Sequence, residues 1–393
     1  METTTPLRSR VGVLDGLRGI AIVLVVLSHG WQLWPTEWID ARDWVRPVFR
    51  SGNTAVTVFL VAGGFLTHRA LSRAGDLRGM RPDTALLRRV LRVGPSLWLM
   101  LLVLCVVWAL DGTLVGSEYD NGPSFLHVLT YTWNWYVQDN LVNSRPEFGH
   151  LWYLSVDMQA FVVMAGLMYV LRRRPLGLVC ATTALLLLLT WWRFHVADIE
   201  FVFQVLVRTT ARMDPFVAGV LASAVVTLLS RTRLDPLVLR LVAGATAVAL
   251  VPLVWYAAVD ERFLGWGVAL LEVDLALLFG AVALGARTPR PLDARVLRFL
   301  GRNSLLVYIW HYPVFVFVQR HAEDWDWQAK ALVGLAGTVV LSMAAHWLLE
   351  RHVTSMLRSP RWRALDDGLP TAAARLARRG AHRALPATRR TSR

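Results

Sequence analysis

An arginine and a histidine share one apolar stretch near the N-terminus, at a spacing that could serve acid–base chemistry. Residues 14–29 read LDGLRGIAIVLVVLSH and place Arg18 and His29 eleven positions apart. Eleven helical residues at about 100° each return to within roughly 20° of the starting direction, so both side chains share one face, about 16 Å apart along the axis. Ionisable groups inside an apolar helix are costly, which favours a functional role. The alternative is an arginine that reaches lipid phosphate and a histidine bonded between helices.

Three arginines lie close together where a later apolar stretch begins. Residues 88–95 read RRVLRVGP and contain Arg88, Arg89 and Arg92. Guanidinium groups bind phosphate through paired hydrogen bonds, so this cluster suits a phosphate-rich ligand. The alternative is that these side chains only anchor the helix at the cytoplasmic surface.

A third polar group begins the fourth apolar segment. Residues 150–159 read HLWYLSVDMQ, and Asp157 is expected about two helical turns below the outer surface, at a depth similar to that of His29. A carboxylate at that depth could orient the imidazole of His29 or accept a proton from it. A polar contact between helices is the alternative.

The remaining ionisable residues of the apolar stretches are expected to be structural rather than catalytic. Arg212 and Asp214 are candidates for a local ion pair. Both cysteines lie in apolar runs and are expected to pack there, and no metal site is expected. The residues considered are Arg212, Asp214, His311, His346, Glu350, Cys105 and Cys180.

The elements that position these residues are predicted to be transmembrane helices. Hydrophobic residues make up 55% of the 393, and they gather into nearly charge-free runs such as 97–110 and 176–192. Runs of this length favour an all-α, polytopic helical bundle, because helices satisfy their own backbone in lipid. About ten spans are predicted, at 13–34, 53–71, 91–110, 151–171, 176–193, 212–229, 239–257, 265–285, 299–320 and 330–350.

The charges of the connecting segments predict an orientation. If the N-terminus is cytoplasmic, 31 basic residues lie in inner segments and nine in outer loops, which also carry acids such as Asp111 and Glu323. The positive-inside rule then places both termini in the cytoplasm. The net charge of +14 is therefore explained by topology, and nucleic acid is not expected as a partner.

Two segments lie outside the predicted helices. The long outer loop 111–150, with its FLHVLTYTWNWYV sequence, is expected at the lipid headgroup level, where tryptophan and tyrosine are favoured. Residues 358–393 form an arginine-rich tail that is expected to be disordered and to lie on anionic lipid. The chain is thus divided into a transmembrane domain, 1–357, and this tail.

Taken together, the motifs resemble the integral membrane acyltransferase-3 family over residues 12–350. The resemblance rests on LDGLRGIAIVLVVLSH, NTAVTVFLVAGGFL, RRVLRVGP, HLWYLSVDMQAFVV and LGRNSLLVYIWHYPV, in this order. Two positions depart from the family pattern. Asp157 stands where many relatives have glutamate, and Ala62-Gly63-Gly64 stands where many have a serine before one glycine.

The resemblance implies transfer of an acyl group, commonly acetyl, from cytoplasmic acyl-CoA to a hydroxyl of a glycan or glycosylated product. Arg18, Arg88, Arg89 and Arg92 would hold the CoA phosphates at the inner mouth. His29 would act as general base on the acceptor hydroxyl, and Asp157 is the candidate orienting partner. Direct transfer and a covalent acyl-histidine both remain open.

A transporter or flippase for a polysaccharide or lipid-linked sugar is the main alternative, since intramembrane Arg, His and Asp also build proton relays. Such proteins often show internal pseudo-symmetry, which this sequence lacks. A lipid-binding scaffold would not need His29. Lys330 is the single lysine among 42 basic residues, which suggests a GC-rich bacterial genome and therefore a cell-envelope glycan or a glycosylated secondary metabolite as acceptor. As a multi-pass protein of such a cell, the chain is expected in the inner (plasma) membrane.

Overall fold

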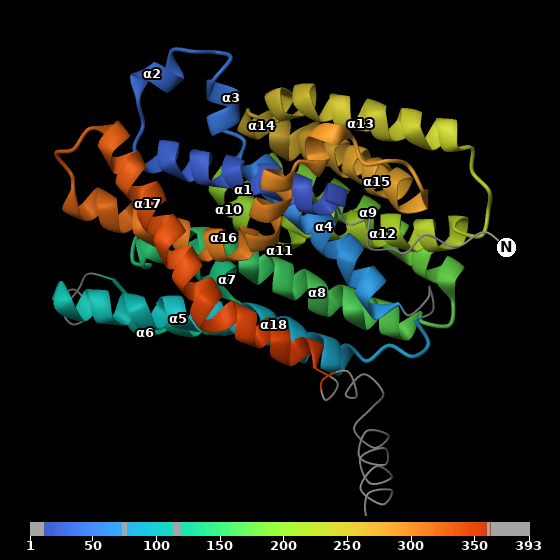
Figure 1. Cartoon of the computed structure of the whole chain (residues 1–393), viewed down its shortest axis with the longest axis horizontal. Helices are drawn as coiled ribbons and strands as arrows, with labels where there is room; N and C mark the ends of the chain where they lie inside the picture. Colours follow the sequence, from blue (N-terminus) through green and yellow to red (C-terminus); the bar gives the residue numbers. More distant parts are fainter. Residues whose placement is uncertain (1–11, 73–76, 113–118, 360–361, 363–393) are drawn as a thin grey trace, which may run out of the picture.

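The computed structural model describes residues 12–72, 77–112, 119–359 and 362, and the described residues contain helices and no β-strand. Ten long helices coincide with the ten predicted spans, which confirms the all-α polytopic bundle. They are α1 (Gly12–Leu33), α4 (Gly52–Leu71), α5 (Pro82–Leu110), α8 (Trp152–Val170), α9 (Pro175–Ala197), α12 (Asp214–Leu229), α13 (Pro236–Tyr256), α15 (Val268–Leu284), α16 (Arg295–His321) and α17 (Trp327–Ala345) (Figure 1).

Within the described residues, eight of these helices, some with an adjoining short segment, are long and apolar enough to cross a membrane. The other two are α12, which has 16 residues, and α16, which begins with Arg295, Arg298 and Arg302.

The short helices are α2 (Glu37–Asp40), α3 (Arg46–Phe49), α6 (Asn121–Leu129), α7 (Trp133–Asp139), η2 (Pro146–Leu151), α10 (Val202–Val207), α11 (Thr209–Arg212), α14 (Asp260–Arg262), η3 (Phe263–Gly267), η4 (Arg290–Asp293), η5 (His346–Glu350) and α18 (Arg351–Arg358).

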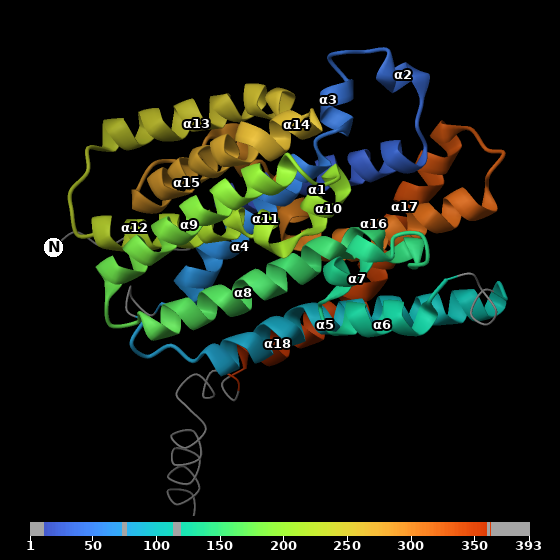
Figure 2. The same cartoon turned by 180° about the vertical axis from the view of Figure 1, so that it is seen from behind.

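The connections between helices gather at the two ends of the bundle. The α8–α9 and α12–α13 connections lie at one end, on the left in Figure 2, and α2 and the α16–α17 turn lie at the other. These are the segments predicted to be inner and outer, respectively, so their separation agrees with the predicted alternation. The side of the membrane on which each end lies stays a prediction.

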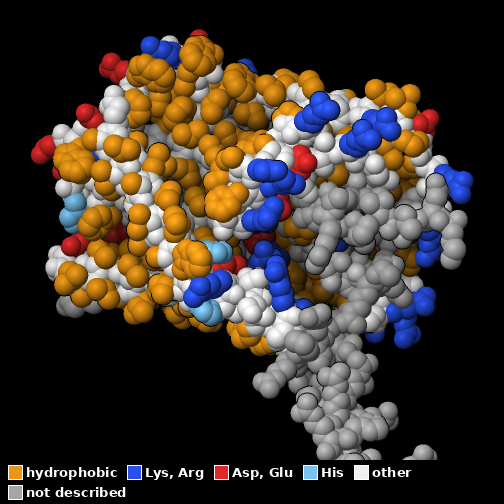
Figure 3. Space-filling model, viewed as in Figure 1, with side chains coloured by type: hydrophobic (Ala, Val, Ile, Leu, Met, Phe, Trp, Pro, Cys, Tyr) orange, Lys and Arg blue, Asp and Glu red, His pale blue; other side chains and the backbone are white. Residues whose placement is uncertain are grey.

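Hydrophobic side chains cover much of the face in Figure 3, and most basic side chains on it lie toward the end that carries the predicted inner loops. The loop 111–150 forms α6, α7 and η2, apart from residues 113–118, which lie outside the described residues. Most of the predicted tail, 358–393, also lies outside them.

Close backbone contacts hold α1 against α16 and α4 against α12. A Cβ atom added at Gly19 would lie 2.1 Å from the Leu297 carbonyl oxygen, and one at Gly301 would lie 1.8 Å from the Asp15 carbonyl oxygen. Between α4 and α12, a Cβ atom on Gly64 would lie 1.9 Å from the Phe216 oxygen. Glycine therefore allows these helices to approach more closely than any side chain would permit, as is common for helices packed in membranes.

A buried polar cluster joins α9, α11, α12 and η3. Asp214 pairs with Arg193 at 2.8 Å, and both side chains are fully buried. The predicted local ion pair of Arg212 with Asp214 is therefore wrong, because the carboxylate takes its partner from the neighbouring helix α9. Arg212 lies close by and donates to the Asn53 carbonyl at 3.5 Å. Arg193 also donates to the carbonyls of Leu264 and Gly265, where the backbone leaves helical geometry.

Candidate active site

A cavity of about 370 Å³ lies between α1, α4, α5 and α8, and we name it the arginine cavity. Five arginines and one carboxylate face it. The four arginines that the sequence assigned to phosphate binding thus line a single cavity, together with Asp157. The charged lining residues are Arg18, Arg81, Arg88, Arg89, Arg92 and Asp157.

Asp157 forms an ion pair with Arg89 inside this cavity. The Arg89 guanidinium donates to the Asp157 carboxylate and, at 3.4 Å, to the Thr67 hydroxyl, and it lies 4.6 Å from the ring centroid of Phe161. Gly63 leaves room for the pair, since a Cβ atom there would lie 3.2 Å from the carboxylate. Arg89 is therefore neutralised and held in place within the cavity.

The other arginines of the cavity differ in their hydrogen-bond partners within the protein. Arg18 donates to the Ser304 hydroxyl at 2.9 Å, and Arg88 donates to the Trp362 carbonyl at 2.5 Å. Arg92 is exposed and has no hydrogen-bond or ion-pair partner within the described part of the chain. The cavity therefore keeps an excess of positive charge that an anionic ligand could neutralise.

A second cavity of about 260 Å³ lies between α1, α4, η2 and α16, and we name it the histidine cavity. Its lining joins imidazoles to flat aromatic rings and to amide and charged side chains. Those that could contact a polar ligand are His29, Trp31, Gln32, Arg50, Asn53, His150, Trp152, Asp260, Tyr308 and Tyr312.

His29 is bonded to a second histidine rather than to a carboxylate. Its Nδ1 lies 2.7 Å from Nε2 of His311, and Nδ1 of His311 lies 3.0 Å from the Val307 carbonyl oxygen. A carbonyl only accepts, so neutral His311 donates through Nδ1 and its Nε2 carries the lone pair. His29 must then donate through Nδ1, which leaves its own Nε2 unprotonated. The hydrogen-bond chain thus makes His29 a candidate base at the wall of the histidine cavity.

The predicted contact between Asp157 and His29 is wrong. Asp157 faces the arginine cavity and pairs with Arg89, while His29 faces the histidine cavity and bonds to His311. Helical periodicity predicts which face of its own helix a residue occupies, but the sequence does not reveal which neighbouring helix covers that face.

Two further residues of the histidine cavity, His150 and Tyr308, were not among the predicted site residues. His150, on η2, is 1% exposed, and among the described residues both of its ring nitrogens lack a hydrogen-bond partner. Tyr308 donates its hydroxyl proton to the His150 carbonyl. Tyr308, His311 and Tyr312 occupy positions i, i+3 and i+4 of α16, a spacing that places them on one helix face and could have indicated the site.

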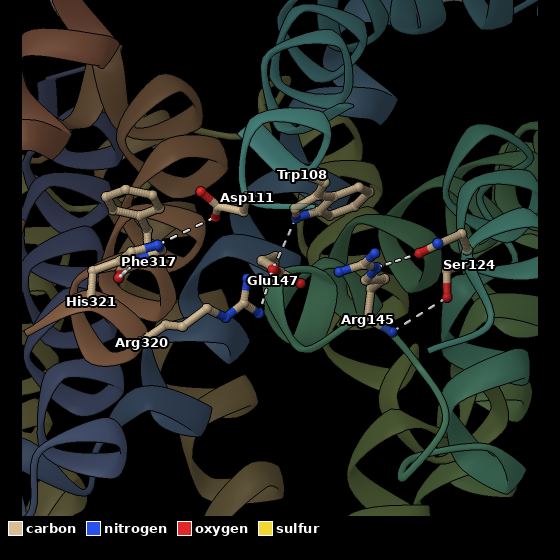
Figure 4. Close-up of polar contacts among 9 residues, drawn as sticks. Trp108, Asp111, Ser124, Arg145, Glu147, Phe317, Arg320 and His321 are labelled. Carbon is tan, nitrogen blue, oxygen red and sulfur yellow. Dashed lines mark hydrogen bonds and ion pairs between the residues drawn. The ribbon is translucent and has the colours of Figure 1, made fainter. Parts of the chain in front are cut away.

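A polar cluster around Glu147 holds η2 in place (Figure 4). Glu147 is 2% exposed and accepts from Trp108 of α5 at 3.0 Å and from Arg320 of α16 at 2.9 Å. The Arg145 guanidinium lies 3.9 Å from the Trp108 ring centroid, and its backbone N–H donates to the Ser124 hydroxyl at 3.3 Å. Burial lowers the pKa of Arg145, and Glu147 acts in the opposite direction. These contacts fix the segment that presents His150 to the histidine cavity.

Comparison with known proteins identifies the family of the chain. Residues 11–347 match a protein family described as an acyltransferase domain. A Komagataeibacter xylinus protein named as a membrane-bound transacylase is 27% identical over 357 residues, which cover 86% of this chain and 81% of that protein. A Staphylococcus aureus (strain COL) protein named as an O-acetyltransferase is 22% identical over 331 residues, which cover 79% of this chain and 52% of that protein. No solved structure matches the chain.

Proposed function

The chain belongs to the integral membrane acyltransferase-3 family and is an O-acyltransferase, and we propose that it moves an acyl group from acyl-CoA to a carbohydrate hydroxyl. Acyl-CoA, acetyl-CoA first, would bind with its phosphates in the arginine cavity. A glycan or glycosylated acceptor would enter the histidine cavity, with His29 as general base. The observation that carries this proposal is the bond from His29 to His311, which leaves Nε2 of His29 ready to accept a proton.

The charge of the arginine cavity supports a phosphate-rich donor. Arg89 is neutralised by Asp157, but Arg18 donates to the neutral Ser304 hydroxyl, and Arg92 has no ion-pair partner in the described residues. Guanidinium groups bind phosphate strongly because each can donate two parallel hydrogen bonds. If both termini are cytoplasmic, as the loop charges predict, this cavity opens toward the compartment that supplies acyl-CoA.

The lining of the histidine cavity supports a carbohydrate acceptor. Trp31, Trp152 and Tyr312 offer flat aromatic faces, on which the C–H face of a sugar ring can stack. Gln32 and Asn53 can exchange hydrogen bonds with sugar hydroxyls. A mostly apolar cleft with a few placed polar groups is typical of sites for small ligands.

The reaction would follow from these positions. Nε2 of His29 takes the proton of the acceptor hydroxyl as its oxygen attacks the thioester carbonyl. The new C–O bond forms, the C–S bond breaks, and the CoA thiolate takes a proton back from His29. His311 would accept the Nδ1–H of His29 throughout and stabilise the imidazolium that forms transiently. Asp157 would act on the donor side, by holding Arg89.

The experiment separates donor binding from transfer. The purified protein in detergent is given radiolabelled acetyl-CoA with a panel of glycan acceptors, and acetyl-CoA binding is measured by calorimetry. His29→Ala should abolish labelled product and leave acetyl-CoA binding unchanged. Arg92→Gln should weaken binding about tenfold, the value of one charge-assisted hydrogen bond. His195→Ala is the matched control, because His195 is exposed and lines neither cavity.

Labelled product from His29→Ala at the wild-type rate would contradict the role of the general base. A wild-type protein that transfers no label to any acceptor, and instead carries a sugar across liposome membranes, would favour a transporter. Transfer of the label to an acceptor by a protein that moves no sugar across the liposome membrane would exclude a transporter.

A further inference from the structure

The arginine cavity and the histidine cavity lie side by side but have no lining residue in common. Neighbours in the sequence face opposite cavities. On α8, Trp152 lines the histidine cavity and Tyr153 lines the arginine cavity. On α4, Val56 lines the histidine cavity and Phe59 lines the arginine cavity. The boundary between the two cavities therefore crosses α4 and α8 at these positions.

Aromatic rings occupy this boundary. The ring centroids of Tyr153 and Tyr308 are 5.3 Å apart, and those of Phe59 and Tyr153 are 6.0 Å apart. These separations are contact distances for aromatic rings, so no acyl chain fits between them as they stand. Phe59 and Tyr153 line the arginine cavity, and Tyr308 lines the histidine cavity.

The two tyrosines are held differently. Tyr308 is 3% exposed, and its hydroxyl donates to the His150 carbonyl, so its ring is anchored to η2. The Tyr153 hydroxyl has no hydrogen-bond partner in the described part of the chain, and its side chain borders open space in the arginine cavity. Tyr153 is thus the less constrained of the two rings, because within the described residues its hydroxyl is not bonded and that of Tyr308 is.

We propose that Tyr153 and Tyr308 form the boundary that the acyl end of the donor must pass to reach His29, and that they restrict the enzyme to short acyl groups such as acetyl. This inference rests on the proposed function, because it takes the donor in one cavity and the base in the other. A narrow passage admits a thin arm and a small acyl group. Beyond it, the acyl group must share about 260 Å³ with the acceptor sugar, so a longer acyl chain competes with the acceptor for this space.

The test compares acyl chain lengths. Turnover of acetyl-CoA, butyryl-CoA and octanoyl-CoA with one acceptor is measured for the wild type, Tyr153→Ala and Tyr153→Phe. The wild type should prefer acetyl-CoA over octanoyl-CoA. Tyr153→Ala should raise the octanoyl-to-acetyl ratio of kcat/KM by about tenfold or more, the size of discrimination expected from a few methylene groups in a restricted space. Tyr153→Phe keeps the ring and should keep the wild-type ratio.

Phe279→Ala is the control for a cavity made elsewhere in the bundle. Phe279 is 1% exposed, packs on Phe65 with ring centroids 5.7 Å apart, and lines neither cavity. Its loss should leave the acyl preference unchanged. If Tyr153→Ala does not fold, Tyr153→Leu provides the same comparison with a smaller change in volume.

Two results would overturn the inference while the proposed function stands. One is a wild-type enzyme that uses all three donors equally. The other is a folded Tyr153→Ala or Tyr153→Leu variant that transfers acetyl groups with the wild-type chain-length ratio. A wild-type protein that uses no acyl-CoA at all would overturn the proposed function, and this inference with it.

Discussion

At the scale of single residues, the hydrogen-bond chain from Val307 through His311 to His29 decides which nitrogen of His29 can act as a base. Imidazole has two possible tautomers, and only a fixed partner selects one of them. His311 is completely buried and supplies that partner, in the place where the sequence predicted a carboxylate. It is therefore a positioning residue in the proposed reaction.

Replacement of His311 should reduce turnover without affecting donor binding. His311→Ala removes the acceptor for the His29 Nδ1–H, and we expect kcat to fall by roughly a hundredfold, within the range that general-base catalysis contributes. The acetyl-CoA KM should not change. His311→Gln should recover part of the loss, because its amide oxygen can accept the same proton. Equal losses in both variants, accompanied by a higher KM, would indicate that His311 only supports packing.

Loss of the ion pair between Arg89 and Asp157 should destabilise the protein more than loss of the Arg92 side chain. Both members are largely buried, with side chains 18% and 12% exposed, so removal of one leaves the other without its partner. We expect Arg89→Gln to destabilise the protein by about 3 kcal/mol, reduced from fully buried cases because some solvent reaches the pair. Arg92→Gln should leave the Tm in detergent unchanged. A Tm for Arg89→Gln equal to that of Arg92→Gln would contradict this assignment.

At the scale of elements, the site depends on how the short helix η2 is held between α5 and α16. Glu147 connects η2 to both helices through Trp108 and Arg320. Because the acceptor oxygen of Glu147 is shared by two donors from different helices, one side chain fixes the segment that carries His150. The backbone of the same segment anchors Tyr308.

Replacement of Glu147 should therefore alter acceptor use. Glu147→Ala removes the partner of Trp108 and Arg320, and we expect a loss of about 3 kcal/mol in stability, at the low end for broken buried pairs because the Arg320 side chain is 29% exposed. The KM of the acceptor should rise while acetyl-CoA binding stays the same. Glu147→Gln retains an acceptor oxygen and should be intermediate in both measurements. If Glu147→Ala changes stability but not the acceptor KM, the cluster does not position the histidine cavity.

At the scale of the whole molecule, the arrangement of charges at the two ends predicts which end faces the cytoplasm. The predicted inner loops lie together at one end of the bundle, and the predicted outer loops lie at the other. The arginine cavity faces the first group, because Arg81 and Arg88 near the start of α5 line it. The orientation of the protein in the membrane therefore decides which compartment supplies the donor to the arginine cavity.

Cysteine labelling can answer it. In a background where Cys105 and Cys180 are replaced by serine, Thr232→Cys and Asp324→Cys each introduce one exposed thiol. In intact cells, a membrane-impermeant maleimide should label Asp324→Cys only, and lysed cells should show labelling of both. The reverse pattern would place the arginine cavity away from cytoplasmic acyl-CoA and contradict the proposed donor path.

The sequence predicted the ten helices and the family, because the length and hydropathy of each segment and the order of the motifs along the chain do not depend on how the helices pack. It also placed the arginines of α5 near that of α1, since charge at a helix start is restricted to one end of the bundle. The sequence predicted α16 as well, although this helix begins with Arg295, Arg298 and Arg302 and is not among the eight described helices that are long and apolar enough to cross a membrane.

The tertiary structure alone decided the partners within the site. His29 and His311 are 282 positions apart, and they meet because Gly19 and Gly301 let α1 and α16 approach to backbone contact. Helical periodicity shows which face a residue occupies, but not which face of another helix covers it. The partners of Asp157 and Asp214, both predicted wrongly, came from neighbouring helices for the same reason. Pairing across helices depends on the packing of the whole bundle.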